Sequence, residues 1–170
     1  MPAFSSKTTR LGWIAYALAG AVILTDQLSK AWILGPFGLP AKGMVEVLPV
    51  LRLTMVWNRG VSFGLLNGHG EAGRWALVVF ETAVALALAI WARRNDRPVL
   101  ALSLGLVMGG ALGNVIDRTR FGAVVDFIDV TALHFPWVFN LADSAINIGV
   151  VLLVWDSLTT SKPAATSTRV

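Results

Sequence analysis

The chain has 170 residues, of which 55% are hydrophobic and only 14% are charged. A water-soluble domain of this size carries about 25% charged residues, so the composition disfavours a soluble all-α bundle and favours a membrane protein. The net charge is +4, but the basic residues form no basic-aromatic face for nucleic acid, so no nucleic-acid partner is expected. The sequence has no cysteine, and its scattered histidines, His69 and His134, make no metal-ligand pattern.

Four apolar stretches are each close to the ~20 residues that cross ~30 Å of hydrocarbon as a helix. They are residues 11–34, 75–92, 99–118 and 137–155. We expect an all-α membrane protein with four transmembrane helices in one integral-membrane domain, residues 1–170, with polar tails at 1–10 and 156–170. The first stretch follows two basic residues, as in a signal peptide. It is too long for one and lacks an A-x-A cleavage site, so we expect a retained helix.

Two polar segments separate these helices. Residues 45–58, VEVLPVLRLTMVWN, are rich in β-branched and aromatic residues, which predicts two short strands interrupted at Pro49. The glycine-bounded residues 60–70 predict a short interfacial helical turn. Residues 124–130, VVDFIDV, predict a further strand, although the alternation does not decide which way each side chain points.

Basic residues predict the orientation of the chain. The short turn 93–97 holds three arginines, and Lys7, Arg10 and Lys162 flank the helices on the same side. We therefore expect both termini and this turn in the cytoplasm, with residues 35–74 and 119–136 outside.

With this topology, polar side chains of all four helices lie at one outer depth. They are Asp26, Lys30, Glu81, Asn114, Asp117, Arg118, Asn140 and Asp143. An ionised carboxylate in hydrocarbon costs at least ~2.5 kcal/mol, so Asp143 indicates chemistry, transport or pairing.

Several of these polar and glycine residues have two interpretations. Asp26 and Lys30 are spaced i,i+4, which favours an ion pair on one helix. The pair either neutralises the helix for membrane insertion or supports a functional site. Arg118 is either a snorkelling anchor at the membrane surface or a cation of the site. Asp117, its neighbour in the sequence, is expected to neutralise its charge. Asn58 lies in a turn signal, and Asp129 is expected to be a solvated loop charge. The glycine repeat Gly105, Gly109 and Gly113 predicts close packing of the third helix on the fourth.

Five blocks of sequence resemble the lipoprotein signal peptidases (signal peptidase II), a family of bacterial membrane aspartyl proteases. The blocks are Asp26-x-x-Ser29-Lys30, Asn58-Arg-Gly-x-Ser-Phe63-Gly64, GGALGNVIDR at 109–118, Val125-Asp126-Phe127, and FNLADSAIN at 139–147. Any one block is weak, but five in order over residues 26–147 are specific.

The resemblance implies a catalytic pair, Asp126 and Asp143, which share a proton and activate water without a metal or cofactor. It implies supporting or substrate-positioning roles for Asp26, Asn58, Asn114, Arg118 and Asn140, to which we add Lys30. It also implies a small extracytoplasmic β-cradle and a short interfacial helix.

The implied reaction removes the signal peptide of a prolipoprotein before a cysteine that carries diacylglyceryl. The expected partners are this substrate and membrane lipid, and the expected setting is the bacterial inner membrane, with the active site facing outward and the protein a monomer.

Two other classes compete with this interpretation. A serine-lysine protease would use Lys30 as base and Ser29, Ser62 or Ser144 as nucleophile. Asp26 would keep Lys30 protonated, which makes it a poor base. A small proton-coupled transporter could relay protons through Asp143 and Glu81. It would need polar residues across the full membrane depth, and the inner halves of the last three helices are nearly bare of them.

Overall fold

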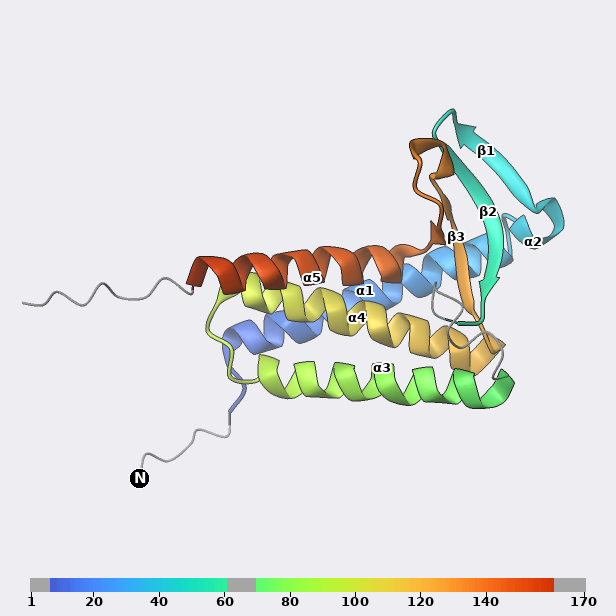
Figure 1. The fold of residues 1–170 in the computed structure, drawn as a ribbon. Helices are drawn as coiled ribbons and strands as arrows, with labels where there is room; N and C mark the ends of the chain where they lie inside the picture. Colours follow the sequence, from blue (N-terminus) through green and yellow to red (C-terminus); the bar gives the residue numbers. More distant parts are fainter. Residues whose placement is uncertain (1–6, 61–69, 161–170) are drawn as a thin grey trace, which may run out of the picture.

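Four long helices lie side by side in the computed structural model, which describes residues 7–60 and 70–160 (Figure 1). They are α1 (Arg10–Leu34), α3 (Gly70–Ala92), α4 (Pro98–Phe121) and α5 (Leu141–Thr160). Each is long and apolar enough to cross a membrane. The four-helix membrane fold is therefore confirmed, whereas the helical turn expected within 61–69 lies outside the described residues.

The helix boundaries differ from the predicted ones for local reasons. α3 begins at Gly70, and α4 continues to Phe121, where Gly122 ends it with a φ of 75° that L side chains rarely adopt. α5 begins at Leu141 rather than at residue 137, because Val138–Phe139 form the short strand β4. It continues to Thr160, beyond the predicted end at 155.

A small antiparallel sheet has the strand order β1-β2-β3-β4. β1 (Met44–Leu48) and β2 (Leu51–Asn58) are the two strands predicted around Pro49, and β3 (Val124–Asp129) is the third. A one-turn helix, α2 (Leu39–Lys42), precedes β1, and a 3₁₀ turn, η1 (Thr131–Leu133), follows β3. The pairing of β2 with β3 is irregular between Leu53 and Val56, so that Val56 faces Asp126 and Arg52 faces Asp129.

The sheet stands at one end of the helical bundle (Figure 1). α1 and α4 run toward the sheet, and α3 and α5 run away from it. The start of α1 and the end of α5 therefore lie together at the opposite end. This relative arrangement brings the polar residues of the four helices to the end that carries the sheet.

α4 is the central helix, because 67% of its apolar stretch is buried, compared with 17–22% in the other three. Its glycines allow the close approach. A Cβ added at Gly105 or Gly109 would lie 2.7 Å from a carbonyl oxygen of α1, and one at Gly110 would lie 2.4 Å from the Ala142 oxygen of α5. The predicted role of the repeat was therefore partly wrong: Gly105 and Gly109 pack α4 on α1, and Gly110 packs it on α5.

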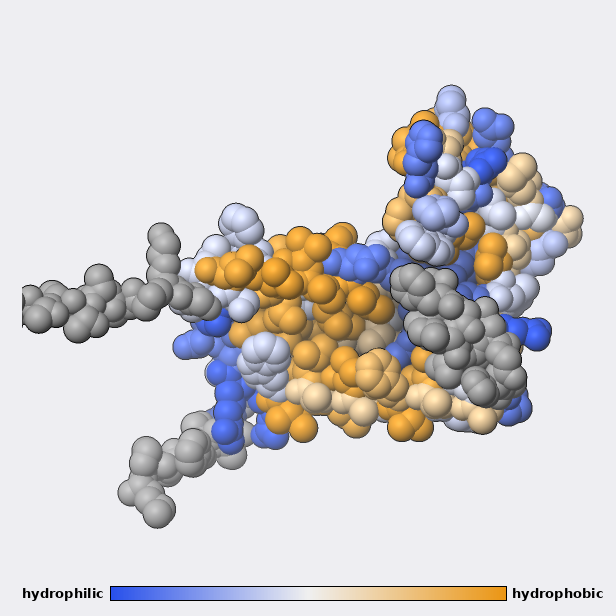
Figure 2. Space-filling view, in the orientation of Figure 1, coloured by the Kyte–Doolittle hydropathy of each residue, from blue (hydrophilic) through white to orange (hydrophobic). Residues whose placement is uncertain are grey.

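The outer faces of the bundle expose large hydrophobic side chains. Phe80, Ile90, Val151 and Leu158 are each 65–72% exposed. Figure 2 shows hydrophobic residues over the helices and hydrophilic ones toward both ends, together with a hydrophilic strip where α5 approaches the sheet. Such a surface suits lipid rather than water.

Candidate active site

Asp126 and Asp143 line one cavity of about 550 Å³ between the sheet and α5. Asp126 lies in β3 and is 1% exposed, and Asp143 lies in the first turn of α5 and is partly buried. The apolar wall of the cavity includes Phe135, Trp137 and Phe139, and the Phe135 ring contacts each of the other two edge to face. The site therefore combines two carboxyl groups with an aromatic wall, as small-molecule and peptide sites commonly do.

Asn140 connects the two aspartates. Its Nδ2 donates to Asp126 Oδ1 at 2.7 Å, and its backbone N–H donates to Asp143 Oδ2 at 3.2 Å. In return, Asn140 Oδ1 accepts the backbone N–H of Asp143 at 2.9 Å. The reciprocal pair is a capping box at the start of α5, and it fixes the Asp143 carboxylate against the N-terminus of the helix.

Two further asparagines hold the outer oxygens of the pair. Asn58 Nδ2 donates to Asp126 Oδ2 at 3.0 Å, while Asn58 Oδ1 accepts the N–H of Gly60. Asn114 Nδ2 donates to Asp143 Oδ1 at 2.9 Å. From the described residues each aspartate therefore accepts two hydrogen bonds, and these partners come from β2, α4 and the segment before α5. The structure brings together all three asparagines that the sequence singled out.

Burial raises the pKa of Asp126 from 3.8 to about 7, and the negative charge of nearby Asp143 adds to this effect. The hydrogen bonds from Asn58 and Asn140 act in the opposite direction but are outweighed. A carboxyl group with a pKa near 7 can hold a proton at neutral pH and also release it. Asp126 therefore has the property required of an acid that works next to a second, charged carboxylate.

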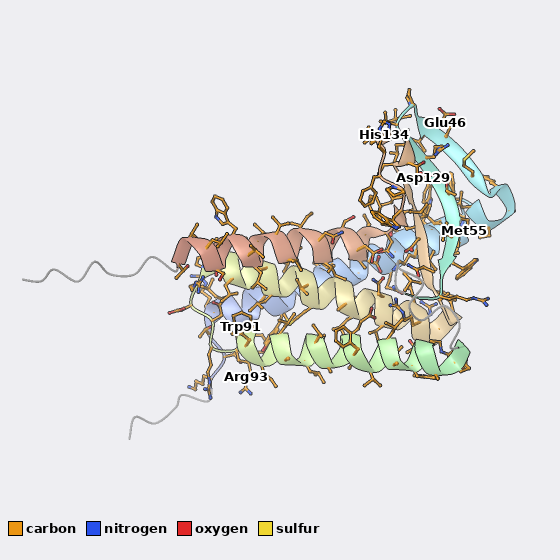
Figure 3. All side chains as sticks on the ribbon, viewed as in Figure 1. Glu46, Met55, Trp91, Arg93, Asp129 and His134 are labelled. Carbon is orange, nitrogen blue, oxygen red and sulfur yellow. The ribbon has the colours of Figure 1, made fainter. Side chains whose placement is uncertain are left out.

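Asp129 is not the solvated loop charge that we expected. It lies in β3, its side chain is 6% exposed, and it accepts hydrogen bonds from Thr54 and Thr131 and pairs with Arg52. Burial raises its pKa, but these partners outweigh burial and hold the pKa at about 2. Residues three apart in a strand point to opposite faces, which separates Asp129 from Asp126. Figure 3 labels Asp129 on the sheet, beyond the helix ends.

Arg118 does not contact the two aspartates. Its Nη1 donates to both carboxylate oxygens of Glu81 at 2.9 Å, which joins α4 to α3. The expectation that Asp117 neutralises Arg118 was wrong, because Asp117 pairs with Lys30 instead. Arg118 is 6% exposed, and its Nε has no hydrogen-bond partner among the residues that the structure describes.

Lys30 is unsuited to serve as the base of a serine protease. Its Nζ lies 2.8 Å from Asp26 Oδ2, as the spacing predicted, and 2.8 Å from Asp117 Oδ2, so it is engaged by two carboxylates rather than by a serine hydroxyl. The hydroxyls of Ser29 and Ser144 donate to helix carbonyls of Asp26 and Asn140. Ser62, the remaining candidate nucleophile, lies outside the described residues.

The sequence reasoning missed three parts of the site. It did not single out Gln27, whose Nε2 bridges Asp26 and Asp117, or the aromatic wall of the cavity. It also missed the capping box, although the spacing Asn140-x-x-Asp143 is a sequence signal for it. Across residues 7–60 and 70–160 the structure has no group of three or more His, Asp or Glu side chains able to hold a metal ion.

The fold and the site together define a multi-pass membrane protein with a carboxyl pair beneath an extramembrane sheet. Residues 18–159 match the protein family described as signal peptidase (SPase) II. The lipoprotein signal peptidase of Caulobacter vibrioides is 51% identical over 158 residues, which cover 92% of each chain. That of Rhodopseudomonas palustris is 44% identical over 147 residues, covering 83% of this chain and 90% of the relative.

Solved structures agree with this relationship. A bacterial membrane enzyme determined by the in meso method at 2.3 Å resolution superposes with a TM-score of 0.77 and 29% identity, covering 96% of this chain and 98% of that one. The chain belongs to the signal peptidase II family. It is therefore a membrane peptidase of the class that removes signal peptides from lipoproteins, and the transporter alternative is not supported.

Proposed function

We propose that this peptidase is an aspartic endopeptidase in which Asp126 and Asp143 carry out general acid and base catalysis on water. The observation that carries the proposal is that both carboxyl groups line one cavity and are joined through the single residue Asn140. Two close carboxyl groups cannot both ionise cheaply, so the pair holds one proton at working pH.

The shared proton belongs mainly to Asp126 in this proposal. Asp126 is almost wholly buried in the sheet, and its pKa is raised to about 7. Asp143 lies at the N-terminus of α5, where the helix dipole and the N–H of Asn140 stabilise negative charge. Asp143 therefore takes a proton from the attacking water, while Asp126 polarises the scissile carbonyl and afterwards protonates the leaving amine. The protons titrate as a property of the pair.

The substrate that we propose is a prolipoprotein whose cysteine already carries a diacylglyceryl group, cut just before that cysteine. The apolar wall of Phe135, Trp137 and Phe139 would contact the apolar part of the substrate, and the lipid tails would lie in the bilayer against α5. Asn58, Asn114 and Asn140 orient the two aspartates. Arg118 is not among the residues that line this cavity, and in this proposal it supports the site through its ion pair with Glu81.

We further propose that the protein lies in the bacterial inner membrane with both termini in the cytoplasm, and that it works as a monomer. The arginine-rich turn at 93–97 supports the orientation. We propose a monomer because Asn58, Asn114 and Asn140 of the same chain already hold both aspartates. The orientation can be tested with single cysteines, since the chain has none of its own.

For that labelling test, Asp96→Cys and Glu46→Cys are suitable because both positions are exposed, unlike the buried Asn95. A membrane-impermeant maleimide should label residue 46 in intact spheroplasts and residue 96 only after the membrane is opened. Labelling of residue 96 in intact spheroplasts would reverse the proposed orientation.

The catalytic proposal is tested by Asp126→Asn and Asp143→Asn in a gel-shift cleavage assay on purified diacylated prolipoprotein. Each variant should lose about 10³-fold or more in kcat, the scale of general acid–base catalysis, and should still bind substrate. Asp129→Asn is the matched control in the same strand and should retain cleavage. A fully active Asp143→Asn would refute the mechanism. Equal cleavage of lipidated and unlipidated substrate would refute the substrate assignment alone.

A further inference from the structure

Lys30 lies in a buried charge cluster that also contains Asp26 and Asp117. These three residues, the Lys30 cluster, are at most 2% exposed, and the ammonium lies 2.8 Å from each carboxylate. Asp26 and Lys30 belong to α1, whereas Asp117 belongs to α4. The cluster contains two acidic side chains and one basic side chain, so it is more than a pair formed to aid insertion.

The two carboxylates of the cluster each hold one backbone N–H. Asp26 Oδ1 accepts the N–H of Ala142 at 3.0 Å, and Asp117 Oδ2 accepts the N–H of Val125 at 3.0 Å. Ala142 immediately precedes Asp143, and Val125 immediately precedes Asp126. The same ammonium therefore joins, through one carboxylate each, the two backbone segments that carry the proposed catalytic aspartates.

Neutral groups complete the connection. Gln27 Nε2 donates to Asp26 Oδ2 at 3.1 Å and to Asp117 Oδ1 at 2.9 Å. Lys30 Nζ also faces Asn114 Oδ1 at 3.5 Å. Asn140 Nδ2 donates to the same oxygen at 3.3 Å, and the two donors together orient the Asn114 amide so that its Nδ2 donates to Asp143. Lys30 thus connects both backbone segments and, together with Asn140, contributes to the orientation of one side-chain amide at the site.

We propose that Lys30 is a positioning residue that sets the separation of Asp126 and Asp143 by holding Asp26 and Asp117 against the N–H groups of Ala142 and Val125. This inference rests on the proposed roles of the two aspartates. A pair of Asp26 and Lys30 alone would already neutralise α1 for insertion. The second buried carboxylate, Asp117, costs free energy unless it is well paired, and its hydrogen bond to β3 gives it a function that neutralisation does not need.

The proposal is tested with Lys30→Met, which keeps a linear side chain but removes the charge. The two acids would then repel each other and release their N–H groups. A displacement of about 1 Å at a catalytic group costs on the order of 100-fold in rate, so kcat should fall about 100-fold. KM for diacylated prolipoprotein should change little, because the residues that line the cavity are untouched.

Asp156→Ala is the matched control. Asp156 is 7% exposed and pairs with the partly exposed Arg97 at the far end of the bundle, so its loss also removes an ion pair that joins α5 to the start of α4. Both variants should melt at a lower temperature than the wild type, but only Lys30→Met should lose kcat. If kcat of Lys30→Met matches that of Asp156→Ala, or if only KM changes, Lys30 is merely structural and the proposal is overturned.

The milder Asp117→Asn carries the test if Lys30→Met does not fold. It keeps an oxygen for the N–H of Val125 but weakens the attraction to Lys30, so kcat should fall at constant KM, and an unchanged kcat would overturn the proposal. Where both variants fold, the double variant should lose no more than the worse single one, because the residues act as a unit. Asp126→Asn separates the two hypotheses: full activity there refutes the catalytic pair itself, whatever Lys30→Met shows.

Discussion

Replacement of Asp126 by asparagine should change how the stability of the protein depends on pH. The pKa of Asp126 is about 7 in the folded protein and 3.8 as the ordinary value. Between these values the folded protein keeps a proton that the unfolded chain has lost, so the wild type becomes less stable as pH rises from 4 to 7. Asparagine does not ionise, and Asp126→Asn escapes this loss.

The size of the effect follows from the shift of about 3 units at 1.36 kcal/mol each, which gives about 4 kcal/mol as an upper bound. A constant term opposes it. Asn58 and Asn140 both donate to Asp126, so the new amide NH₂ would face a donor at a cost of about 1–3 kcal/mol. This second term does not depend on pH. The difference in unfolding free energy between variant and wild type therefore changes with pH only through the ionisation of Asp126.

The assay is thermal unfolding in detergent at pH 4.5, 6 and 8, followed by the fluorescence of the seven tryptophans. The Tm of the variant minus that of the wild type should rise by about 5–10 °C between pH 4.5 and pH 8. A difference that is constant with pH, or that falls, would show that Asp126 is already ionised at low pH and would refute its assignment as the protonated partner.

Three further outcomes are expected. Asp129→Asn should lose about 1 kcal/mol of stability at neutral pH. Because the pKa of Asp129 is lowered to about 2, this loss should fade as the pH is lowered through 4 toward 2. A loss that does not depend on pH would show that the charge of Asp129 does not stabilise the fold. Arg118→Ala should lose far more cleavage activity than Arg120→Ala, because Arg118 is buried against Glu81 whereas Arg120 is exposed. Equal, mild losses in folded protein would return Arg118 to the role of a membrane anchor. Gly110→Ala should lose about 1–3 kcal/mol of stability, because its Cβ would meet the Ala142 oxygen. The Cβ of Gly20→Ala meets nothing within 4 Å, so this variant should be neutral or stabilising in a melting assay. Equal melting temperatures of the two variants would contradict the close α4–α5 contact.

Hydropathy was sufficient to predict the four helices, because a bilayer demands long uninterrupted apolar segments. It was insufficient for the start of α5. Residues 137–139 (Trp-Val-Phe) are as apolar as the helix that follows, so the hydropathy window extended over β4. The capping pair of Asn140 and Asp143 marks the true boundary, and a search for caps as well as hydropathy would have found it.

The supporting contacts were harder to predict, because they depend on which helices are neighbours. The glycine repeat of α4 indicates close approach, but nothing in the pattern says that Gly105 and Gly109 face α1 while Gly110 faces α5. Likewise, Asp117 is next to Arg118 in sequence and yet pairs with Lys30 of α1, 2.8 Å away. The direction of a side chain on a helix decides such pairs, and only the packed bundle fixes it.

The course of the chain around the cavity separates the residues of the proposed chemistry from those of the proposed substrate recognition. The β3–β4 connection, residues 130–137, supplies Val130, Phe135 and Trp137 to the cavity wall. Among the described residues, the hydrogen bonds to Asp126 and Asp143 come instead from Asn58, Asn114 and Asn140. This one hairpin can therefore diverge in shape and size between related enzymes without disturbing the carboxyl pair. It is the natural segment to exchange when a peptidase of this family is to be adapted to a different set of secreted precursors.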